Sequence, residues 1–309
     1  MLETVYIEEE VKEHPRVKRF LSGRNPRVIF IERYTEIFNR KAQNFRLQKE
    51  NPALIIAKKY GNYLHPTPPK FSIGGKENYY FSTVLNCPFD CSYCFLQGMF
   101  LSAYYVWFVN YEDFQQAIEE KIKEVQEPYF FSGYDSDSLA MEGITHFAEE
   151  FLPFFEGKKG FLEFRTKSIN IRPLLQRNPL PNCIAAFTLS PKIIAEEKEL
   201  KAPPFEKRLQ AAVQLQNKGW QIGLRFDPLI YHPEFESIYG IFFKEVFKFL
   251  SNIHSVTVGV FRLPPTFQKN MERIGIKTTD TPNDKKEKML SFCKENLLQY
   301  LPEEKLFFQ

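Results

Sequence analysis

The sequence predicts an α/β protein built on a partial (β/α)6-type barrel, with a small N-terminal α/β subdomain before it and a C-terminal helix after it. Three observations carry this prediction. Short apolar strands alternate with helical stretches from residue 79 onward, which is typical of βαβ units. Polar and apolar residues alternate within several of these strands, and three cysteines share one short loop at the start of the series.

Composition limits the class of protein. With 43% hydrophobic and 26% charged residues among 309, the chain can bury a full core, which excludes collagen-like and wholly disordered proteins. The net charge of +3 is too small to indicate nucleic-acid binding by bulk charge. The longest apolar run, residues 103–109, falls far short of the roughly 20 residues of a membrane span, and residues 1–12 lack the pattern of a secretory signal. We therefore expect a cytoplasmic protein without membrane contact.

Proline-rich segments and changes in the residue pattern along the chain predict three parts. Residues 1–75 contain a strand-like segment at 27–32 and a proline-rich linker at 65–69, and form the N-terminal subdomain. Residues 76–263 form the barrel, and residues 264–309 a C-terminal extension. In this extension an amphipathic helix over 285–301 places an apolar residue at every fourth position.

The barrel elements are predicted in order from local signals. Asn110 is a plausible N-cap for a helix after the second strand, a helix is expected over 141–155, and another opens at Pro203-Pro204 and closes at Gly219. The predicted strands are 79–85, 103–109, 129–133, 161–166, 183–189, 221–227 and 256–263.

Alternation inside the strands predicts a polar lumen. Arg165 and Lys167 share one face of their strand, Thr188 and Ser190 share a face of the next, and Asp227 ends the strand after that. In a barrel these groups meet near the carboxyl ends of the strands, where such folds hold their ligands. The alternative is an open sheet with one solvated face.

The cysteine triplet is the most informative motif. Cys87, Cys91 and Cys94 are separated by three and then two residues, and three thiolates on one loop can bind three irons of a 4Fe–4S cluster while leaving the fourth iron open. A structural zinc site completed by His65 or a distant cysteine is the alternative. Cys183 and Cys293 lie on apolar faces and are expected to be buried small hydrophobes.

At these residues the sequence resembles the radical S-adenosylmethionine (SAM) enzymes, whose hallmark is C-x3-C-x2-C with an aromatic residue, here Tyr93, before the third cysteine. The resemblance implies a radical SAM barrel in which the open iron of a 4Fe–4S cluster chelates SAM, and in which one-electron reduction cleaves SAM to methionine and a 5′-deoxyadenosyl radical.

A narrower resemblance, to the spore photoproduct lyase family, extends over most of the chain. The residues that carry it are Cys-Pro-Phe-Asp-Cys-Ser-Tyr-Cys-Phe-Leu-Gln at 87–97, the Ser-Asp pair at 136–137, Phe-Arg-Thr-Lys at 164–167, Arg208, and Asp-Pro-Leu-Ile-Tyr-His at 227–232. It implies repair of a UV-made thymine dimer in DNA. With Tyr93 of the cysteine motif, it places the following residues around SAM: Ser136, Asp137, Lys167, Thr188 and Ser190.

Two positions depart from the family pattern. Tyr134 stands where the repair enzymes carry a hydrogen-donating cysteine, and Phe95 stands where they carry a tyrosine. A phenol O–H can donate a hydrogen atom, so we hypothesise that Tyr134 faces the substrate as a catalytic residue. The basic, aromatic hairpin with which the family grips DNA is not evident at 276–286.

Partners follow from these expectations. Damaged DNA is the substrate that the resemblance implies, and basic stretches at 16–27 and 33–46 with interspersed aromatic residues could contact it, although charge runs are usually solvated faces. Flavodoxin or ferredoxin is the expected kind of electron donor. A radical SAM enzyme with another substrate, or a non-enzymatic metal-stabilised nucleic-acid-binding module, are the alternatives. The oligomeric state is not predicted.

Overall fold

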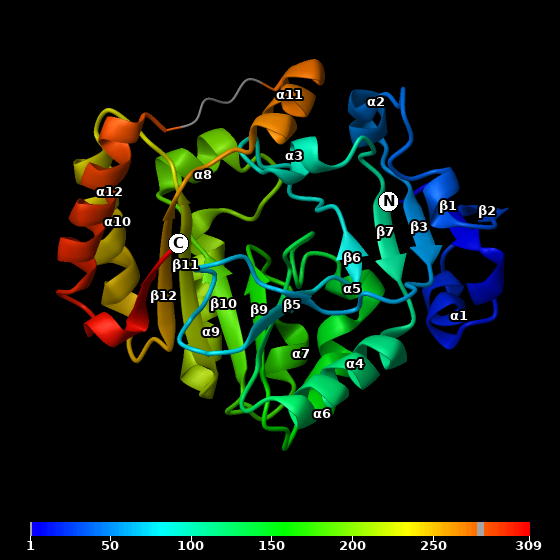
Figure 1. Cartoon of the computed structure of the whole chain (residues 1–309), viewed down its shortest axis with the longest axis horizontal. Coiled ribbons are helices and arrows are strands. Elements are labelled where there is room, and N and C mark those ends of the chain that lie inside the picture. The colour runs from blue at the N-terminus through cyan, green and yellow to red at the C-terminus, as the bar shows by residue number, and fades with distance from the viewer. Residues whose placement is uncertain (1, 277–280) are drawn as a thin grey trace.

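The computed structural model describes residues 2–276 and 281–309, which form two sheets surrounded by helices (Figure 1). The larger sheet has eight strands in the order β13-β12-β11-β10-β9-β8-β5-β4, and the smaller has five in the order β2-β1-β3-β7-β6. The strands of the larger sheet are β4 His65–Pro66, β5 Asn78–Phe81, β8 Tyr129–Ser132, β9 Phe161–Thr166, β10 Cys183–Thr188, β11 Gln221–Leu229, β12 Ser255–Val260 and β13 Leu306–Phe308. Those of the smaller are β1 Thr4–Glu8, β2 Arg27–Ile31, β3 Leu54–Ala57, β6 Val84–Leu85 and β7 Tyr105–Phe108.

Helices connect and cover the sheets. They are α1 Pro15–Leu21, α2 Phe45–Glu50, α3 Leu96–Met99, α4 Tyr111–Glu124, α5 Glu142–Thr145, α6 Phe147–Phe155, α7 Arg172–Leu175, α8 Lys192–Lys198, α9 Phe205–Lys218, α10 Phe235–Phe249, α11 Pro265–Arg273 and α12 Asn283–Leu297. Short 3-10 turns lie at Glu9–Val11, Tyr34–Glu36 and Glu303–Lys305. No helix in the described residues has the length and apolarity needed to cross a bilayer.

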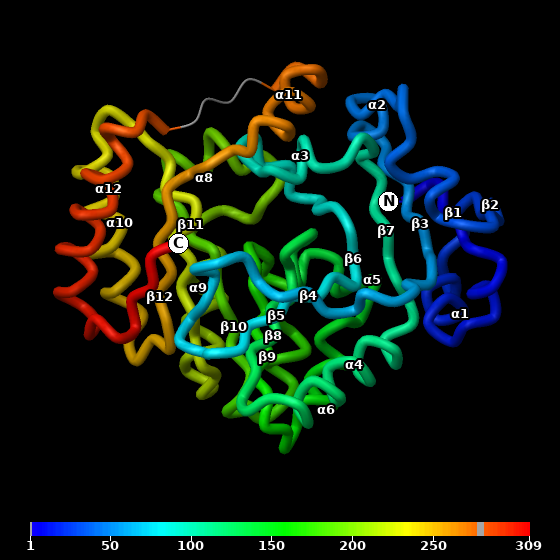
Figure 2. Tube along the Cα trace, viewed as in Figure 1, coloured from blue at the N-terminus to red at the C-terminus, as the bar shows by residue number. Residues whose placement is uncertain are grey.

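The partial barrel is confirmed. Strands β5, β8, β9, β10, β11 and β12 pair in parallel, one after another, and form one continuous sheet (Figure 2). Helix α9 closes at Gly219, whose φ of 100° is the left-handed conformation that glycine adopts without strain.

Two predicted strands lie elsewhere than expected. The apolar run 79–85 is not one strand, because β5 belongs to the barrel and β6 to the smaller sheet. The predicted strand at 103–109 contains β7, which pairs with β3 and β6 in the smaller sheet rather than in the barrel. Apolar periodicity identifies a strand but does not choose its neighbours, and this explains both errors.

The helix expected over 141–155 is interrupted at His146. This residue has φ 51°, and the Glu142 carboxylate accepts a hydrogen bond from the Ala148 N–H at 2.9 Å, which caps the second helix. At the other end of the chain, α12 ends at Leu297, four residues before the predicted end at 301, and the unpredicted β13 adds a parallel strand to β12.

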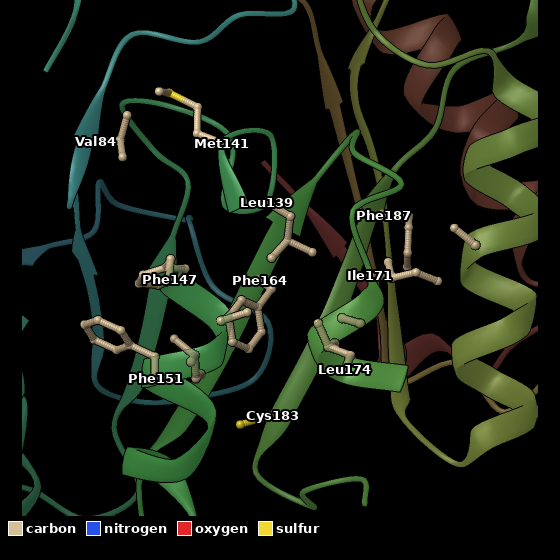
Figure 3. Close-up of a cluster of buried hydrophobic side chains, with 14 of the residues drawn as sticks. Val84, Leu139, Met141, Phe147, Phe151, Phe164, Ile171, Leu174, Cys183 and Phe187 are labelled. Atoms are coloured by element: carbon tan, nitrogen blue, oxygen red, sulfur yellow. The ribbon is translucent and has the colours of Figure 1, made fainter. Parts of the chain in front are cut away.

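The core lies between the barrel and its outer helices and is rich in phenylalanine. Figure 3 shows part of it, where Phe147 and Phe151 of α6 meet Phe164 of β9, with Leu174 and Cys183 nearby. Cys183 and Cys293 are fully buried, as predicted. The apolar outer face of the sheet is therefore covered, and its polar residues are left to line the lumen.

Candidate functional site

A cavity of about 260 Å³ opens at the carboxyl ends of the barrel strands. All three clustered cysteines line it, together with residues that follow β8, end β9 and β10, lie in β11 and follow β12. The predicted residues in its lining are Cys87, Cys91, Tyr93, Cys94, Tyr134, Ser136, Asp137, Lys167 and Thr188. Parallel strands aligned in register bring these distant segments to one edge of the sheet.

The cysteine loop is clamped by the last residue of α8 and the segment that follows it. The Ser92 N–H donates to the Lys198 carbonyl at 2.8 Å, and the Lys201 N–H donates to the Phe89 carbonyl at 2.9 Å. On the other side the Asn86 amide donates to the Ser102 carbonyl at 2.8 Å. The loop is therefore held from both sides, which limits how far its thiols can move.

The three thiols fit an iron–sulfur cluster. None forms a disulfide, and burial raises the pKa of each, to about 12 for Cys91. A buried thiolate needs a compensating cation, and a cluster supplies one. No three His, Cys, Asp or Glu side chains among residues 2–276 and 281–309 are arranged to hold a metal ion. In a cluster each thiolate binds a different iron, so the thiols need not converge on one ion.

Sequence reasoning missed Glu199, the centre of the polar network beside the loop. Its buried carboxylate accepts hydrogen bonds from the Tyr93 hydroxyl, from Ser190 Oγ at 3.0 Å and from Arg208 Nη2 at 2.5 Å. The nearby Lys167 and Arg208 cations, together with these hydrogen bonds, hold the pKa of the Glu199 carboxyl below its usual value despite its burial. Glu199 follows α8 in a charged run that looks like a solvated helix face, so no local pattern distinguishes it from its exposed neighbours.

Lys167 stands between this network and the cavity. Its ammonium lies 3.8 Å from Glu199 Oε1 and 5.6 Å from the centre of the Tyr93 ring, and its side chain is 14% exposed. It is thus a cation that lines the cavity beside the cysteine loop.

Asp137 is occupied by internal hydrogen bonds. Thr166 Oγ1 and the Lys167 N–H each donate to its carboxylate at 2.6 Å, and the N–H groups of Leu139 and Ala140 add two further bonds. The carboxylate therefore joins the loop after β8 to the end of β9, and so positions Lys167.

The predicted hydroxyl residues have different surroundings. Ser136 Oγ donates to the Asn86 carbonyl at 2.7 Å, next to the first cysteine. Thr188 lines the cavity, and its carbonyl accepts from Arg208. Ser190 lies outside the cavity lining, and its hydroxyl is used by Glu199.

Tyr134 lies in an aromatic row at the cavity wall. Its ring stacks on Tyr80 of β5 with centroids 4.3 Å apart, and Phe95 and Phe71 lie 5.9 and 6.1 Å from it. Burial raises the pKa of the phenol, and the charges that act on it are those of Asp135 and Arg165. The stack with Tyr80 was not predicted, because nothing in the sequence pairs the two positions.

The other charged residues of the lumen differ in their ion-pair partners and in whether they line the cavity. Arg225 and Glu163 form a buried pair that does not line the cavity, while Arg165 pairs with Asp227 at 2.8 Å at the cavity wall. Arg262 is exposed at the cavity edge.

Most aromatic residues in and between the basic stretches of the N-terminal region are not exposed, although Phe30 is 52% exposed. Phe20, Phe38 and Phe45 are buried, and Arg16 is engaged by Glu112 and Glu150. The interspersed aromatic residues are therefore mainly core.

Comparisons with known proteins agree on one family. A family model described as spore photoproduct lyase matches residues 70–305. The spore photoproduct lyase of Bacillus subtilis (strain 168) is 25% identical over 164 residues, 52% of this chain and 48% of that protein. That of Geobacillus sp. (strain Y412MC61) is 25% identical over 194 residues, 61% of this chain and 56% of that protein. The chain thus spans about half the length of the curated relatives it matches.

Solved structures show the same fold. A spore photoproduct lyase double mutant with bound AdoMet and dinucleoside spore photoproduct superposes with a TM-score of 0.85 at 17% identity, covering 100% of this chain and 98% of that chain. A spore photoproduct lyase complexed with dinucleoside spore photoproduct gives a TM-score of 0.85 at 16% identity and the same coverage.

Proposed function

This chain belongs to the spore photoproduct lyase family, and from that premise we propose that it is a radical SAM enzyme that repairs a UV thymine photoproduct in DNA. The observation that carries the proposal is the clamped loop, on which three thiols face the cavity in C-x3-C-x2-C spacing. The free thiols suit a reducing compartment, and we place the protein in the cytoplasm.

Cys87, Cys91 and Cys94 would hold a 4Fe–4S cluster. When bound, the cluster and SAM supply a carbon-centred radical able to abstract a hydrogen atom. The protein's task is to bind, orient and exclude water. The electron that starts the reaction would come from a carrier such as flavodoxin or ferredoxin.

The cavity residues would bind SAM by complementary charge. Lys167 offers an ammonium for the SAM carboxylate, since it lines the cavity beside the cysteine loop. Ser136, Asp137 and Tyr93 shape the cavity close to the thiols, and Thr188 lies on the next strand. Ser190 would act indirectly, by holding Glu199.

Tyr134 would return the hydrogen atom to the substrate radical. Its O–H bond breaks and a substrate C–H bond forms, which leaves a tyrosyl radical that one electron from the reduced carrier protein and one proton from solvent would restore to the phenol. Tyr134 lines the cavity, where a substrate can approach it. Phe95, which lines the cavity 5.9 Å away, cannot take part because it has no O–H.

The Tyr134 and Phe95 positions also favour a second candidate, a radical SAM reaction on a different substrate. The stack of Tyr134 on Tyr80 gives this wall a flat aromatic surface, and a cysteine could not reproduce that surface. Both candidates use the same cluster and SAM site.

The decisive experiment is anaerobic. The reconstituted, reduced protein is incubated with SAM, with and without a DNA oligomer carrying spore photoproduct, and 5′-deoxyadenosine and thymine are quantified. Both products are expected. 5′-Deoxyadenosine without thymine would support the second candidate instead.

A matched pair of variants tests the cluster site. Cys91→Ala should abolish iron and sulfide binding and SAM cleavage, whereas Cys183→Ala, a buried cysteine far from the cavity lining, should keep them. If Cys91→Ala retains full activity, the proposal is wrong.

A further inference from the structure

A second, narrow cavity of about 30 Å³ reaches the same three thiols. Phe45 and Lys49 of α2 line it, together with Asp90 and Gln97 of the cysteine loop region. It shares only the three cysteines and Leu96 with the main cavity, so the cysteine loop is the wall between the two. The thiols can therefore be approached from a side that SAM and substrate leave free.

Helix α2 is joined to the back of the loop through Asp90. The Lys49 ammonium lies 3.4 Å from Asp90 Oδ1, Gln97 Nε2 donates to the same oxygen at 2.6 Å, and Lys201 Nζ lies 3.8 Å from Asp90 Oδ2. Phe45 is buried and the Lys49 side chain is 10% exposed. These two side chains of α2 therefore separate the narrow cavity from solvent.

The exposed surface around this helix is basic. Arg40 and Lys41 precede α2 and Arg46 lies on it, and all three are exposed; Lys201, which shares Asp90 with Lys49, is 54% exposed. Leu47 is 62% exposed among these cations, and Glu50 is the one acidic residue between 37 and 50. In Figure 1, α2 lies at the edge of the molecule close to α3, which follows the third cysteine. We name Arg40, Lys41, Arg46, Leu47 and Lys201 the α2 face.

We propose that the α2 face is the docking surface for an acidic one-electron carrier protein that reduces the cluster. The inference rests on the proposed function, since it presumes a cluster on the three cysteines. One electron passes from the reduced carrier to the cluster, so the carrier is oxidised and the cluster reduced by one electron, with no bond made or broken. Electron tunnelling weakens exponentially with distance, which favours the side where the thiols lie behind one layer of side chains.

Charge complementarity favours an acidic carrier protein, rather than DNA, as the partner of the α2 face. A basic face raises the encounter rate with an acidic protein and orients it. DNA would also be attracted, but the aromatic residues of this segment, Phe38 and Phe45, are buried and offer no base-stacking surface. The α2 face also lies behind the cysteine loop, whereas a DNA lesion has to reach the main cavity.

The test measures reduction of the reconstituted holoenzyme by reduced flavodoxin, followed by the visible absorbance of the cluster in a stopped-flow instrument. Arg40→Glu/Lys41→Glu should lower the second-order rate constant by about tenfold or more at low salt, and the difference should vanish at high salt. Reduction by dithionite, which needs no docking surface, should be unchanged.

The control is Lys244→Glu/Lys248→Glu on α10, which makes the same change in net charge on exposed lysines of another face. Equal slowing by both double variants would show a general charge effect and overturn the proposal. An unchanged flavodoxin rate with weaker binding of a DNA oligomer would also overturn it and assign the face to nucleic acid.

A second measurement does not depend on the cluster. Oxidised flavodoxin is titrated into cluster-free protein, and the dissociation constant should rise about tenfold in the Arg40→Glu/Lys41→Glu variant but not in the α10 control. Failure to assemble a cluster would count against the proposed function alone. An equal dissociation constant in both variants would count against the docking surface alone.

Discussion

The barrel contains two buried glutamate–arginine pairs that are equally hidden from solvent but differ in what surrounds them. Glu163 and Arg225 are each 1% exposed, and the guanidinium binds both carboxylate oxygens, at 3.0 and 2.7 Å. Glu199 and Arg208 are 1% and 0% exposed, yet this carboxylate also accepts from Tyr93 and Ser190 and lies near Lys167.

The two pairs differ in whether all the hydrogen-bond donors of the arginine are used. The remaining donors of Arg225 go to the Leu224 and Ser255 carbonyls and to the Ser255 hydroxyl, so that pair is closed. Arg208 Nε, by contrast, is buried without a partner in the described part of the chain. Burial alone therefore does not distinguish a structural pair from one that serves a site, whereas contact with residues that line the cavity, here Tyr93 and Lys167, does.

The largest expected effect is on the closed pair. Glu163→Gln leaves the Arg225 charge buried without a counter-charge, and should lower the free energy of unfolding by about 3–5 kcal/mol. Urea denaturation at neutral pH measures it. Glu163→Met/Arg225→Met should recover much of the loss, because it removes both charges together. A loss below about 1 kcal/mol for the single variant would contradict our account of this pair.

The same substitution in the Glu199–Arg208 pair removes the counter-charge of a second buried guanidinium, because Arg208 is 0% exposed. Glu199→Gln should therefore also lower the free energy of unfolding by about 3–5 kcal/mol. The urea experiment on matched Gln variants compares the two sites directly. A loss below about 1 kcal/mol for Glu199→Gln would contradict our account of this pair.

A substitution at the cavity wall should weaken SAM binding and change the free energy of unfolding only slightly. Lys167→Met should alter the free energy of unfolding by about 1 kcal/mol or less and weaken SAM binding about tenfold or more, since it removes a charge-assisted contact. Equilibrium dialysis of SAM against the reconstituted protein measures the affinity. Lys158→Met, which removes a lysine paired with Glu119 outside the cavity lining, is the control and should leave affinity unchanged.

The smallest stability effect is expected at Tyr134. Tyr134→Phe keeps the ring that stacks on Tyr80 and removes only the hydroxyl, so the free energy of unfolding should change by at most about 0.5 kcal/mol. Product yield should fall while 5′-deoxyadenosine formation continues. Unchanged yield and purity of the product would exclude this tyrosine as the hydrogen donor.

Much of the fold and part of the candidate site could be predicted because the signals are local. Three cysteines within eight residues lie in one loop in any fold, and alternation along β9 places Arg165 and Lys167 on the same face. Proline before a helix and Gly219 after it mark boundaries by their own backbone preferences. The parallel barrel follows from the order of its strands and helices.

Tertiary structure alone decided the long-range choices. It assigned β7 to the smaller sheet, brought Glu199 to Tyr93 across 106 positions and stacked Tyr134 on Tyr80. It also made the cysteine loop a wall with a cavity on each side. A residue's own chemistry and its near neighbours determine strand, helix and turn, whereas its partners depend on how the whole chain packs.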